Sequence, residues 1–359
     1  MNIKHVSIIG LGLIGGSIAK ALQKSQNQFV ISAYDKPEVL EKAISENVID
    51  NKLISIENSI ESDLIFLCLP VSKSIEVFEL LTPKLKYNSI LTDVCSVKNI
   101  FNEKWNQIES SGFYFGGHPM TGKEKGGYDN SDALLFENSV YILTDNEIDN
   151  PLFLELQDII TSFGSKILHI PPMQHDVIAA SVSHLPQLVS VALVNAASLK
   201  TDNYNFLDLA AGGFRDMTRI ASSEFEIWES IIKNNKKQIL AAMDKFSYDL
   251  STLTTWILND DYSSIHNYFE TARICRDEVP QNSKGFLNPL FDLFVFVTDQ
   301  PGAISKISTA LFNSGINIKD MELLKIREGS GGTFRLAFEK EEDVKNAASI
   351  LKTIGFETA

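Results

Sequence analysis

The sequence predicts an α/β protein with three parts: a Rossmann-type dinucleotide-binding domain, an all-helical domain, and a ferredoxin-like (βαββαβ) domain. Three observations predict this organisation. A glycine-rich turn follows an apolar strand at the N-terminus, long helical periodicity fills residues 171–277, and residues 291–359 read strand, helix, strand, strand, helix with a short tail for a last strand. With 359 residues, the chain is long enough for two or three domains.

The first element is an apolar strand that leads through a glycine-rich turn into a helix. Gly10 permits the tight turn, Gly12 removes a side chain where a pyrophosphate approaches, and Gly15 lets the helix pack closely on the strand. The free helix N-terminus then faces the negative charge of the phosphates. The residues predicted to bind the cofactor here are Gly10, Gly12, Leu13, Ile14 and Gly15.

A second strand, residues 29–34, ends at Asp35, about 20 residues after the turn, where the dinucleotide fingerprint expects an acid. A carboxylate there accepts hydrogen bonds from ribose hydroxyls and repels a 2′-phosphate. We therefore predict NAD rather than NADP, although the neighbouring Lys36 could favour the phosphate. The alternative is a glycine turn in some other βαβ unit.

Further short strands alternate with helical patterns up to about residue 170, which is typical of a doubly wound parallel sheet. They are expected at residues 63–69, 90–95, 114–117 and 139–143. Ligands bind at the carboxyl edge of such sheets. Residues 1–170 are therefore predicted to form the NAD-binding domain, with the site along that edge.

The predicted helical domain covers residues 171–277, with long periodic stretches at 175–199 and 224–258 and an internal break at Gly212-Gly213. Residues 278–290 contain two prolines, a glycine and polar residues, so they read as a linker. The third domain, residues 291–359, follows that linker.

Composition excludes several classes of partner. The net charge of −14 makes nucleic acid an unfavourable partner, and three widely spaced cysteines form neither a disulfide framework nor a metal pattern. No apolar run is expected to reach the roughly 18 residues that span a bilayer, and no signal peptide precedes the first strand. We therefore expect a cytoplasmic protein without a membrane partner.

Two clusters near predicted strand ends carry candidate catalytic residues. Ser96 follows the strand at 90–95 and could lie at the carboxyl edge, although a serine there could instead cap a helix. His118 sits among glycines and a proline after the next strand, in what we expect to be an open loop. Histidine is suited to proton transfer near neutral pH, so we expect His118 to be functional and to titrate near pH 6.5.

Two further clusters lie in the helical domain. His184 precedes a proline by two residues and is either a packed helix residue or a polar group that faces the cleft. Arg215 and Arg219 are four residues apart and so are expected to share a helical face. That face could be solvated surface or a carboxylate clamp, because a guanidinium fork matches a carboxylate.

The combination GLGLIGGS, DVCSVK, GGHPMTGKEKGG, HDVIAASVSHLPQ and GGFRDMTRIASS resembles the prephenate dehydrogenase family, and the C-terminal region resembles an ACT regulatory domain. The resemblance covers nearly the whole chain. It implies NAD-dependent oxidative decarboxylation of prephenate to 4-hydroxyphenylpyruvate, a step toward tyrosine. It also implies a homodimer formed through the helices of residues 224–258, whose large apolar faces suit such contact.

The resemblance also implies residue roles. His118 corresponds to the residue that takes the proton from the ring hydroxyl, Ser96 to a serine that hydrogen-bonds this hydroxyl and the histidine, and Arg219 to the arginine that holds a substrate carboxylate. His184 corresponds to a second pocket histidine and Glu124 to an acid at the pocket entrance, while Arg215 could join the clamp. One departure is Gln187, where many members carry histidine. The remaining histidines, His5, His169, His175 and His266, are interpreted as structural or surface residues.

In the ACT-like region, the resemblance implies an effector site that includes Asp299, Gly302 and Asn317, with tyrosine as the expected effector. The alternative is a domain that only assists oligomerisation.

Other functions remain open at this stage. Arogenate dehydrogenase shares the fold and the chemistry, and no residue separates the two. A non-catalytic sensor of NAD and amino acids would not need Ser96, His118 and Arg219. A different dehydrogenase with a helical dimerisation domain would be expected to carry a lysine-centred site and no ACT-like region.

Overall fold

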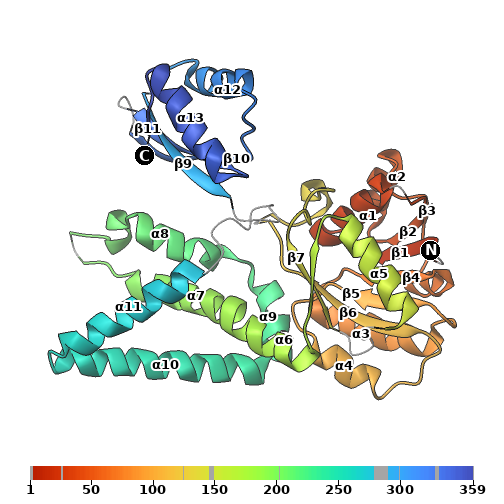
Figure 1. Cartoon of the computed structure of the whole chain (residues 1–359). Coiled ribbons are helices and arrows are strands. Elements are labelled where there is room, and N and C mark those ends of the chain that lie inside the picture. Colours follow the sequence, from red (N-terminus) through yellow and green to blue (C-terminus); the bar gives the residue numbers. More distant parts are fainter. Residues whose placement is uncertain are drawn as a thin grey trace. The chain divides into compact units, whose positions relative to one another are not determined.

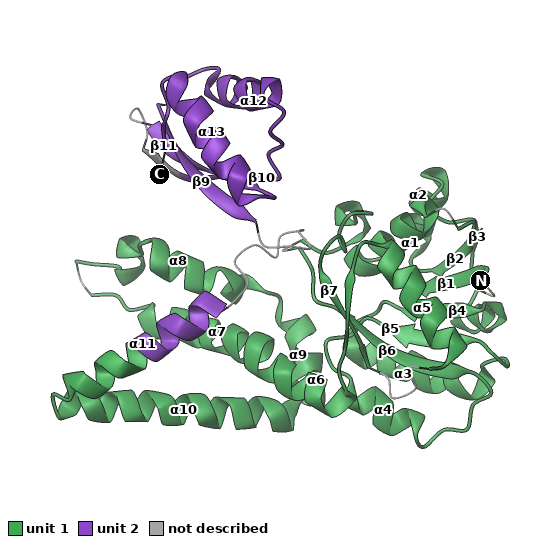
Figure 2. Cartoon of the chain, in the orientation of Figure 1, with its two compact units in different colours: residues 1–269 green, residues 270–359 purple. Residues whose placement is uncertain are grey.

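The computed structural model describes residues 3–25, 27–123, 125–144, 149–201, 203–278, 290–298, 300–327 and 331–358. The chain divides into two compact units, Met1–Phe269 and Glu270–Ala359 (Figure 2). The first unit holds both the dinucleotide-binding sheet and most of the helical region.

Unit 1 is built on an eight-stranded sheet in the order β3-β2-β1-β4-β5-β6-β7-β8 (Figure 1). The first six positions follow the Rossmann order, which confirms the predicted fold. The sheet is not wholly parallel, however, because β7 runs antiparallel to β6. The strands are β1 His5–Ile9, β2 Val30–Tyr34, β3 Asn51–Lys52, β4 Leu64–Leu67, β5 Ile90–Asp93, β6 Phe113–Pro119, β7 Val140–Thr144 and β8 Lys166–His169.

Helices pack on both faces of this sheet, so alternate residues of the central strands enter opposite cores. In β4, Leu64 and Phe66 join the core that also includes residues of α1, α2 and α5, whereas Ile65 and Leu67 join the core with α3 and α4. The helices are α1 Leu13–Lys24, α2 Pro37–Ser45, α3 Val71–Leu81, α4 Asn99–Trp105 and α5 Pro151–Ser162, with short turns η1 Ile56–Glu61, η2 Thr82–Lys84 and η3 Tyr128–Asn130.

The helical region of unit 1 adds to the core on the α3–α4 face, where Ala180, Ile231 and Ile239 are buried. A π-turn, η4, separates the first two helices just before Pro186, whose missing N–H cannot continue a regular helix. Gly212-Gly213 begins a helix rather than breaking one. The elements are α6 Pro172–Ala179, η4 Ala180–His184, α7 Leu185–Ala197, η5 Phe206–Leu209, α8 Gly212–Thr218, η6 Arg219–Ser222, α9 Phe225–Asn234, α10 Lys236–Leu258 and α11 Tyr262–Glu278, which crosses the division between the units.

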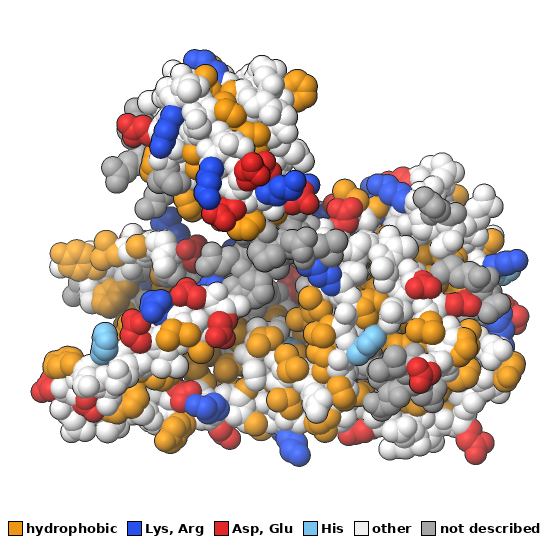
Figure 3. Space-filling view, in the orientation of Figure 1, with side chains coloured by type: hydrophobic (Ala, Val, Ile, Leu, Met, Phe, Trp, Pro, Cys, Tyr) orange, Lys and Arg blue, Asp and Glu red, His pale blue; other side chains and the backbone are white. Residues whose placement is uncertain are grey.

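We expected no apolar run long enough to span a bilayer, but the helical segment Pro172–Ala197 is long and apolar enough to do so by length and composition alone. Its polar residues His175, Asp176 and His184 are nevertheless buried within unit 1. Apolar side chains are exposed on this segment and on α10, among them Val177, Ile178, Val182, Leu240, Met243 and Leu250. Hydrophobic side chains appear on the surface in Figure 3. An exposed apolar surface of this kind suits contact with another protein surface.

Unit 2 contains a four-stranded antiparallel sheet in the order β10-β11-β9-β12, covered by two helices. This βαββαβ arrangement confirms the ferredoxin-like prediction, including the short last strand. Its buried core includes Leu293, Val295, Ile307, Leu311, Leu336, Phe338, Ala347 and Leu351. The elements are β9 Phe291–Val297, α12 Ala303–Asn313, β10 Asp320–Arg327, β11 Gly331–Phe338, α13 Glu341–Thr353 and β12 Glu357–Thr358.

Candidate active site and effector pocket

The glycine turn has the geometry that a dinucleotide requires. Gly10 adopts a φ of +97°, and a Cβ at Gly15 would collide with the carbonyl oxygen of Gly10. Among the described residues, a Cβ at Gly12 would meet open space and no side chain caps the N-terminus of α1. The backbone amides at the start of α1, which include those of Leu13 and Ile14, can therefore face a pyrophosphate.

Asp35 follows β2 and lies against this turn. Its Oδ2 accepts a hydrogen bond from the Leu11 amide at 2.5 Å, and its Oδ1 accepts one from the Lys36 amide at 2.6 Å. These bonds fix a half-buried carboxylate beside the turn, at the position where a ribose hydroxyl would donate. The residues present therefore fit a dinucleotide whose ribose carries no 2′-phosphate.

His118 lies within β6, near its carboxyl end, and is half-buried rather than placed in an open loop. Its Nδ1 is 2.8 Å from Nε2 of His175, and Nδ1 of His175 is 2.8 Å from Oδ1 of Asp176. His175 and Asp176 are both buried at the start of the helical region. His175 was interpreted as a structural or surface residue; it is buried rather than at the surface, and its ring contacts that of His118 directly.

Asp176 joins this histidine pair to the sheet. Its Oδ1 also accepts a hydrogen bond from the Lys98 amide at 2.7 Å, and its Oδ2 accepts one from the Asn99 amide at 3.0 Å. The start of α4 is thus capped by a carboxylate from a distant part of the sequence rather than by Ser96. Ser96 lies half-buried in the loop between β5 and α4, and Nδ1 of His118 has His175 rather than Ser96 as its partner.

A buried ion pair lies next to these residues. Lys98 and Asp93 are both fully buried, and Lys98 Nζ donates to Oδ1 of Asp93. The Tyr114 hydroxyl donates to Oδ2 of Asp93 at 2.7 Å, and the Cys95 amide donates to Oδ1 at 2.8 Å. The lysine charge is therefore compensated locally, which a buried charge requires.

Burial lowers the pKa of His118 well below its ordinary 6.5, and the neighbouring His175, Lys98 and His184 lower it further. His118 is therefore unprotonated at neutral pH and available as a base. The expectation that it titrates near pH 6.5 was wrong, because it ignored the loss of water around the ring.

His184 is a packed residue with one unused polar atom. Its Nδ1 is 3.3 Å from Nδ2 of Asn235, which also donates to the carbonyl oxygen of Asp176 at 2.8 Å. The edge of the ring packs against Trp228, with the ring centroids 6.0 Å apart. Nε2 is buried without a hydrogen-bond partner among the described residues, and burial lowers the pKa of His184 to about 4. The ring is therefore neutral and has a nitrogen that can still form a hydrogen bond.

The two arginines do not share one regular helix. Arg215 lies in α8, which ends at Thr218, and Arg219 begins η6. Both side chains are exposed. Gln187 connects this segment to α7, because its Nε2 donates to the carbonyl oxygen of Ile220 at 2.9 Å. Glu124, the predicted acid at the entrance, lies outside the described residues.

No metal-binding cluster of three or more His, Cys, Asp or Glu side chains occurs among the residues that the structure describes. Sequence reasoning missed His175 and Asp176. The signal that could have found them is the His-Asp pair that opens the HDVIAASVSHLPQ motif, at the start of a predicted helix and shortly after the end of a strand.

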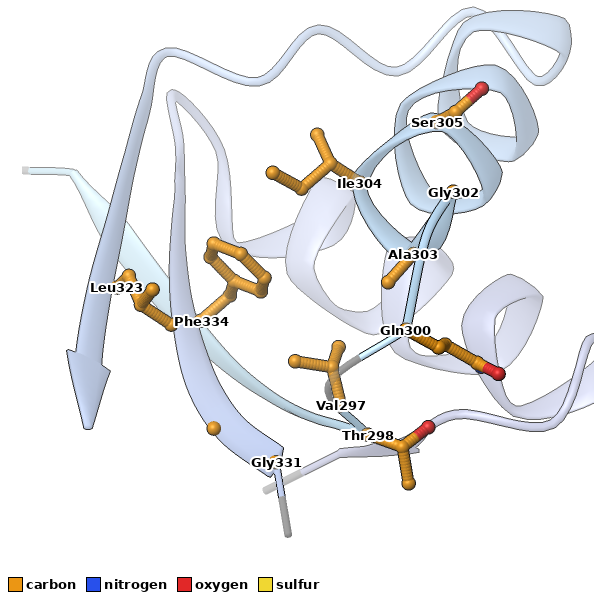
Figure 4. Close-up of a pocket in the computed structure, with 11 residues that line it drawn as sticks. Val297, Thr298, Gln300, Gly302, Ala303, Ile304, Ser305, Leu323, Gly331 and Phe334 are labelled. Carbon is orange, nitrogen blue, oxygen red and sulfur yellow. The ribbon is translucent and has the colours of Figure 1, made fainter. Parts of the chain in front are cut away.

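Unit 2 contains a cavity of about 440 Å³ between α12 and the sheet (Figure 4). This volume lies within the range of small-molecule sites. Gly302 lines it and immediately precedes α12, with a φ of +89°. Asn317 is not among the lining residues, and Asp299 lies outside the described residues. The lining residues are Val297, Thr298, Gln300, Gly302, Ala303, Ile304, Ser305, Leu323, Gly331, Gly332 and Phe334.

The fold and the site together define a dinucleotide-binding oxidoreductase with an attached ACT domain. Residues 18–169 match the nucleotide-binding domain of prephenate dehydrogenase, residues 171–271 match its dimerization domain, and residues 291–356 match the ACT domain. The chain belongs to the prephenate dehydrogenase family, which confirms the resemblance seen in the sequence.

Individual relatives agree with this assignment. The chain is 32% identical to the prephenate dehydrogenase of Bacillus subtilis over 353 residues, which covers 97% of this chain and 95% of the relative. A crystal structure of prephenate dehydrogenase from A. aeolicus, in complex with hydroxyphenyl propionate and NAD+, is 30% identical with a TM-score of 0.70 and covers 78% of this chain and 99% of that one. The structure of Synechocystis arogenate dehydrogenase is also 30% identical, with a TM-score of 0.67, covering 76% and 99%.

Proposed function

We propose that this protein catalyses the NAD-dependent oxidative decarboxylation of prephenate to 4-hydroxyphenylpyruvate, in tyrosine biosynthesis. The observation that carries the proposal is the position of His118 at the carboxyl edge of a dinucleotide-binding sheet, 2.8 Å from a buried His-Asp pair. The A. aeolicus relative, whose structure holds NAD+ and a hydroxyphenyl compound, supports this choice of cofactor and substrate class.

The proposed reaction releases carbon dioxide and makes the ring aromatic, and bound NAD accepts the hydride from the ring carbon that carries the hydroxyl group. His118 takes the hydroxyl proton as the hydride leaves. When the C–CO₂ bond breaks, its electron pair enters the ring and the ring oxygen recovers that proton from His118. The reaction therefore releases no net proton, and His118 acts first as a base and then as an acid.

The other site residues bind and orient the substrate in this proposal. Ser96 hydrogen-bonds the ring hydroxyl, and Arg219 holds a carboxylate of the dianionic substrate, with Arg215 as a weaker second cation. His184 contributes its unused Nε2 to the pocket, which accounts for a buried polar atom without a partner in the described part of the chain. Glu124 is retained as an acid at the entrance.

Asp35 and the glycine turn select the cofactor. The residues assigned to NAD are Gly10, Gly12, Leu13, Ile14, Gly15 and Asp35. A fixed carboxylate opposes a 2′-phosphate, so we propose a preference for NAD over NADP.

The domain roles follow from the same assignment. We assign residues 1–170 to cofactor binding, 171–277 to substrate binding and dimerisation, 278–290 to a linker, and 291–359 to regulation. The exposed apolar residues of the helical region support a homodimer, and the cavity of unit 2 supports feedback inhibition by tyrosine. Gly302 lines this cavity, whereas Asp299 and Asn317 remain proposed effector residues. We propose that the enzyme is cytoplasmic.

Arogenate is the second candidate substrate, because the Synechocystis arogenate dehydrogenase is as similar in sequence as the A. aeolicus enzyme. The test is the appearance of reduced nicotinamide absorbance with purified protein, with prephenate or arogenate combined in turn with NAD or NADP. We expect the fastest turnover with prephenate and NAD. Faster turnover with arogenate would identify arogenate, rather than prephenate, as the substrate. No turnover in any of the four combinations would favour a non-catalytic sensor.

A further inference from the structure

The hydrogen bonds of Asp176 determine the direction of every bond in the histidine pair. Asp176 accepts backbone N–H groups at both carboxylate oxygens, from Lys98 and Asn99, so it acts as an ionised acceptor. Nδ1 of His175 must then donate to Oδ1 of Asp176. In a neutral imidazole, the other nitrogen has no proton, so Nε2 of His175 is an acceptor.

The acceptor on His175 in turn determines which nitrogen of His118 carries the proton. Because Nε2 of His175 accepts, Nδ1 of His118 must carry the proton that is donated across the 2.8 Å contact. Nε2 of His118 then carries the lone pair. A histidine fixed in this tautomer has one nitrogen held by the protein and the other available to a substrate.

We infer that His175 and Asp176 are positioning residues, which hold His118 with its proton on Nδ1 so that Nε2 receives the proton of the substrate. This inference rests on the proposed function, in which His118 is the base. Nε2 is then the reactive atom of His118. His175 and Asp176, which take no proton from the substrate in the proposed reaction, act by positioning His118.

The surroundings of His118 disfavour its protonated form, so the added proton needs a stabilising partner. Burial and three neighbouring groups, His175, Lys98 and His184, disfavour the imidazolium. Lys98 is already paired with Asp93, and among the described residues Asp176 is the carboxylate that contacts the histidine pair. When His118 takes a proton, its Nδ1–H becomes a stronger donor to His175, whose own N–H is oriented by Asp176. Since the oxygen on the substrate ring recovers the proton, His175 and Asp176 need to stabilise protonated His118 for only part of one turnover.

Two substitutions of His175 separate its two nitrogens. The amide of an asparagine lies near the position of Nδ1 and that of a glutamine near Nε2. His175→Asn therefore keeps a donor for Asp176 but loses the contact with His118, whereas His175→Gln can still accept from Nδ1 of His118. Substitution of Asp176 is less informative, because it also removes the cap of α4. His169→Asn is the matched control, because His169 is exposed and its ring is hydrogen-bonded to Gln157, away from the histidine pair.

The first measurement is steady-state kinetics of the full-length chain. We expect His175→Asn to lower kcat roughly 10- to 100-fold with KM for substrate and NAD near normal, as partial loss of base catalysis predicts. His175→Gln should recover part of this loss, and His169→Asn should not change kcat. A raised KM with unchanged kcat in His175→Asn would overturn the inference, as would equal losses in the Asn and Gln variants.

The second measurement does not depend on turnover. Imidazole ¹⁵N chemical shifts of the full-length protein labelled at histidine, assigned with the same variants, report which nitrogen of each ring carries the proton. We expect His118 protonated at Nδ1 in the unmodified protein and a mixture of tautomers in His175→Asn. A His118 protonated at Nε2, or a doubly protonated His175, would refute the inference. If neither substrate turned over but His118 had the expected tautomer, the proposed function would fail, and of the inference only the fixed tautomer of His118 would stand.

Discussion

The candidate active site and the cavity of unit 2 differ in how their polar atoms are used. Around His118, polar side chains from the sheet and the helical region are joined by hydrogen bonds in a largely buried interior. The cavity of unit 2 is instead lined mainly by apolar side chains and glycines (Figure 4). A fixed network suits proton transfer, which requires one geometry, whereas an apolar cavity suits reversible binding of a small molecule. Substitutions in the two regions should therefore change different quantities.

The largest effect is expected from His118→Asn. Removing the base should lower kcat by about 100- to 10,000-fold while the affinity for NAD stays near normal. Stopped-flow or steady-state absorbance of reduced nicotinamide measures kcat, and fluorescence titration measures NAD binding. His169→Asn serves as the control. Retention of most of the activity would remove His118 from the mechanism.

The next effect concerns stability at low pH. The pKa of His184 is about 4 in the folded protein but 6.5 when the ring is free in solution, so the unfolded chain binds more protons between these values. Stability should therefore fall as pH drops from about 6.5 to about 4, by about 3 kcal/mol from this group. Urea unfolding across this range should show a smaller loss in His184→Gln. The exposed His266→Gln should keep the full loss, and equal slopes in both variants would contradict the assignment.

A smaller effect is expected from the arginines. A charge-assisted hydrogen bond typically contributes about 1.5 to 3 kcal/mol, so Arg219→Ala should raise KM for prephenate roughly 10- to 100-fold. Arg215→Ala should raise KM less, because the proposal assigns the substrate carboxylate to Arg219 and gives Arg215 only a weaker second role. Initial-rate kinetics on both variants decide the order. The reverse order would assign the carboxylate clamp to Arg215.

The smallest effect is expected in unit 2. Leu323 lines the cavity and is 42% exposed, so Leu323→Ala should remove apolar contact with an effector worth about 1 kcal/mol. The tyrosine concentration for half-inhibition should then rise about fivefold, with kcat unchanged. Ile354→Ala is the control, because Ile354 is 45% exposed and does not line the cavity. Unchanged inhibition by tyrosine in Leu323→Ala would place the effector elsewhere.

The fold could be predicted well from the sequence because its signals are local. Alternating apolar residues, the spacing from Gly10 to Asp35 and the turn glycines each determine a short segment, and these segments assemble in the expected order. The antiparallel direction of β7 was missed, because a short apolar strand carries no sign of its direction. The boundary predicted between the sheet and the helical region stays a prediction, since both lie in one compact unit.

The candidate site was predicted less completely, because its network joins distant parts of the chain. His118 and His175 are 57 residues apart, and Lys98 and Asp176 are 78 apart. No periodicity reports such contacts. The pKa of His118 was also mispredicted, because the sequence shows the residue type but not the water excluded from around it. In unit 2, Gly302 lies in the turn motif and lines the cavity, whereas Leu323 and Phe334 come from strands outside that motif.

The carboxylate of Asp176 performs two tasks with the same two oxygens, since it caps the start of α4 and orients His175. Under the inference that His175 and Asp176 position His118, a mutation at this position would impair folding and turnover together. Selection for stability and selection for turnover then both act on this one side chain, so a substitution there has to satisfy both.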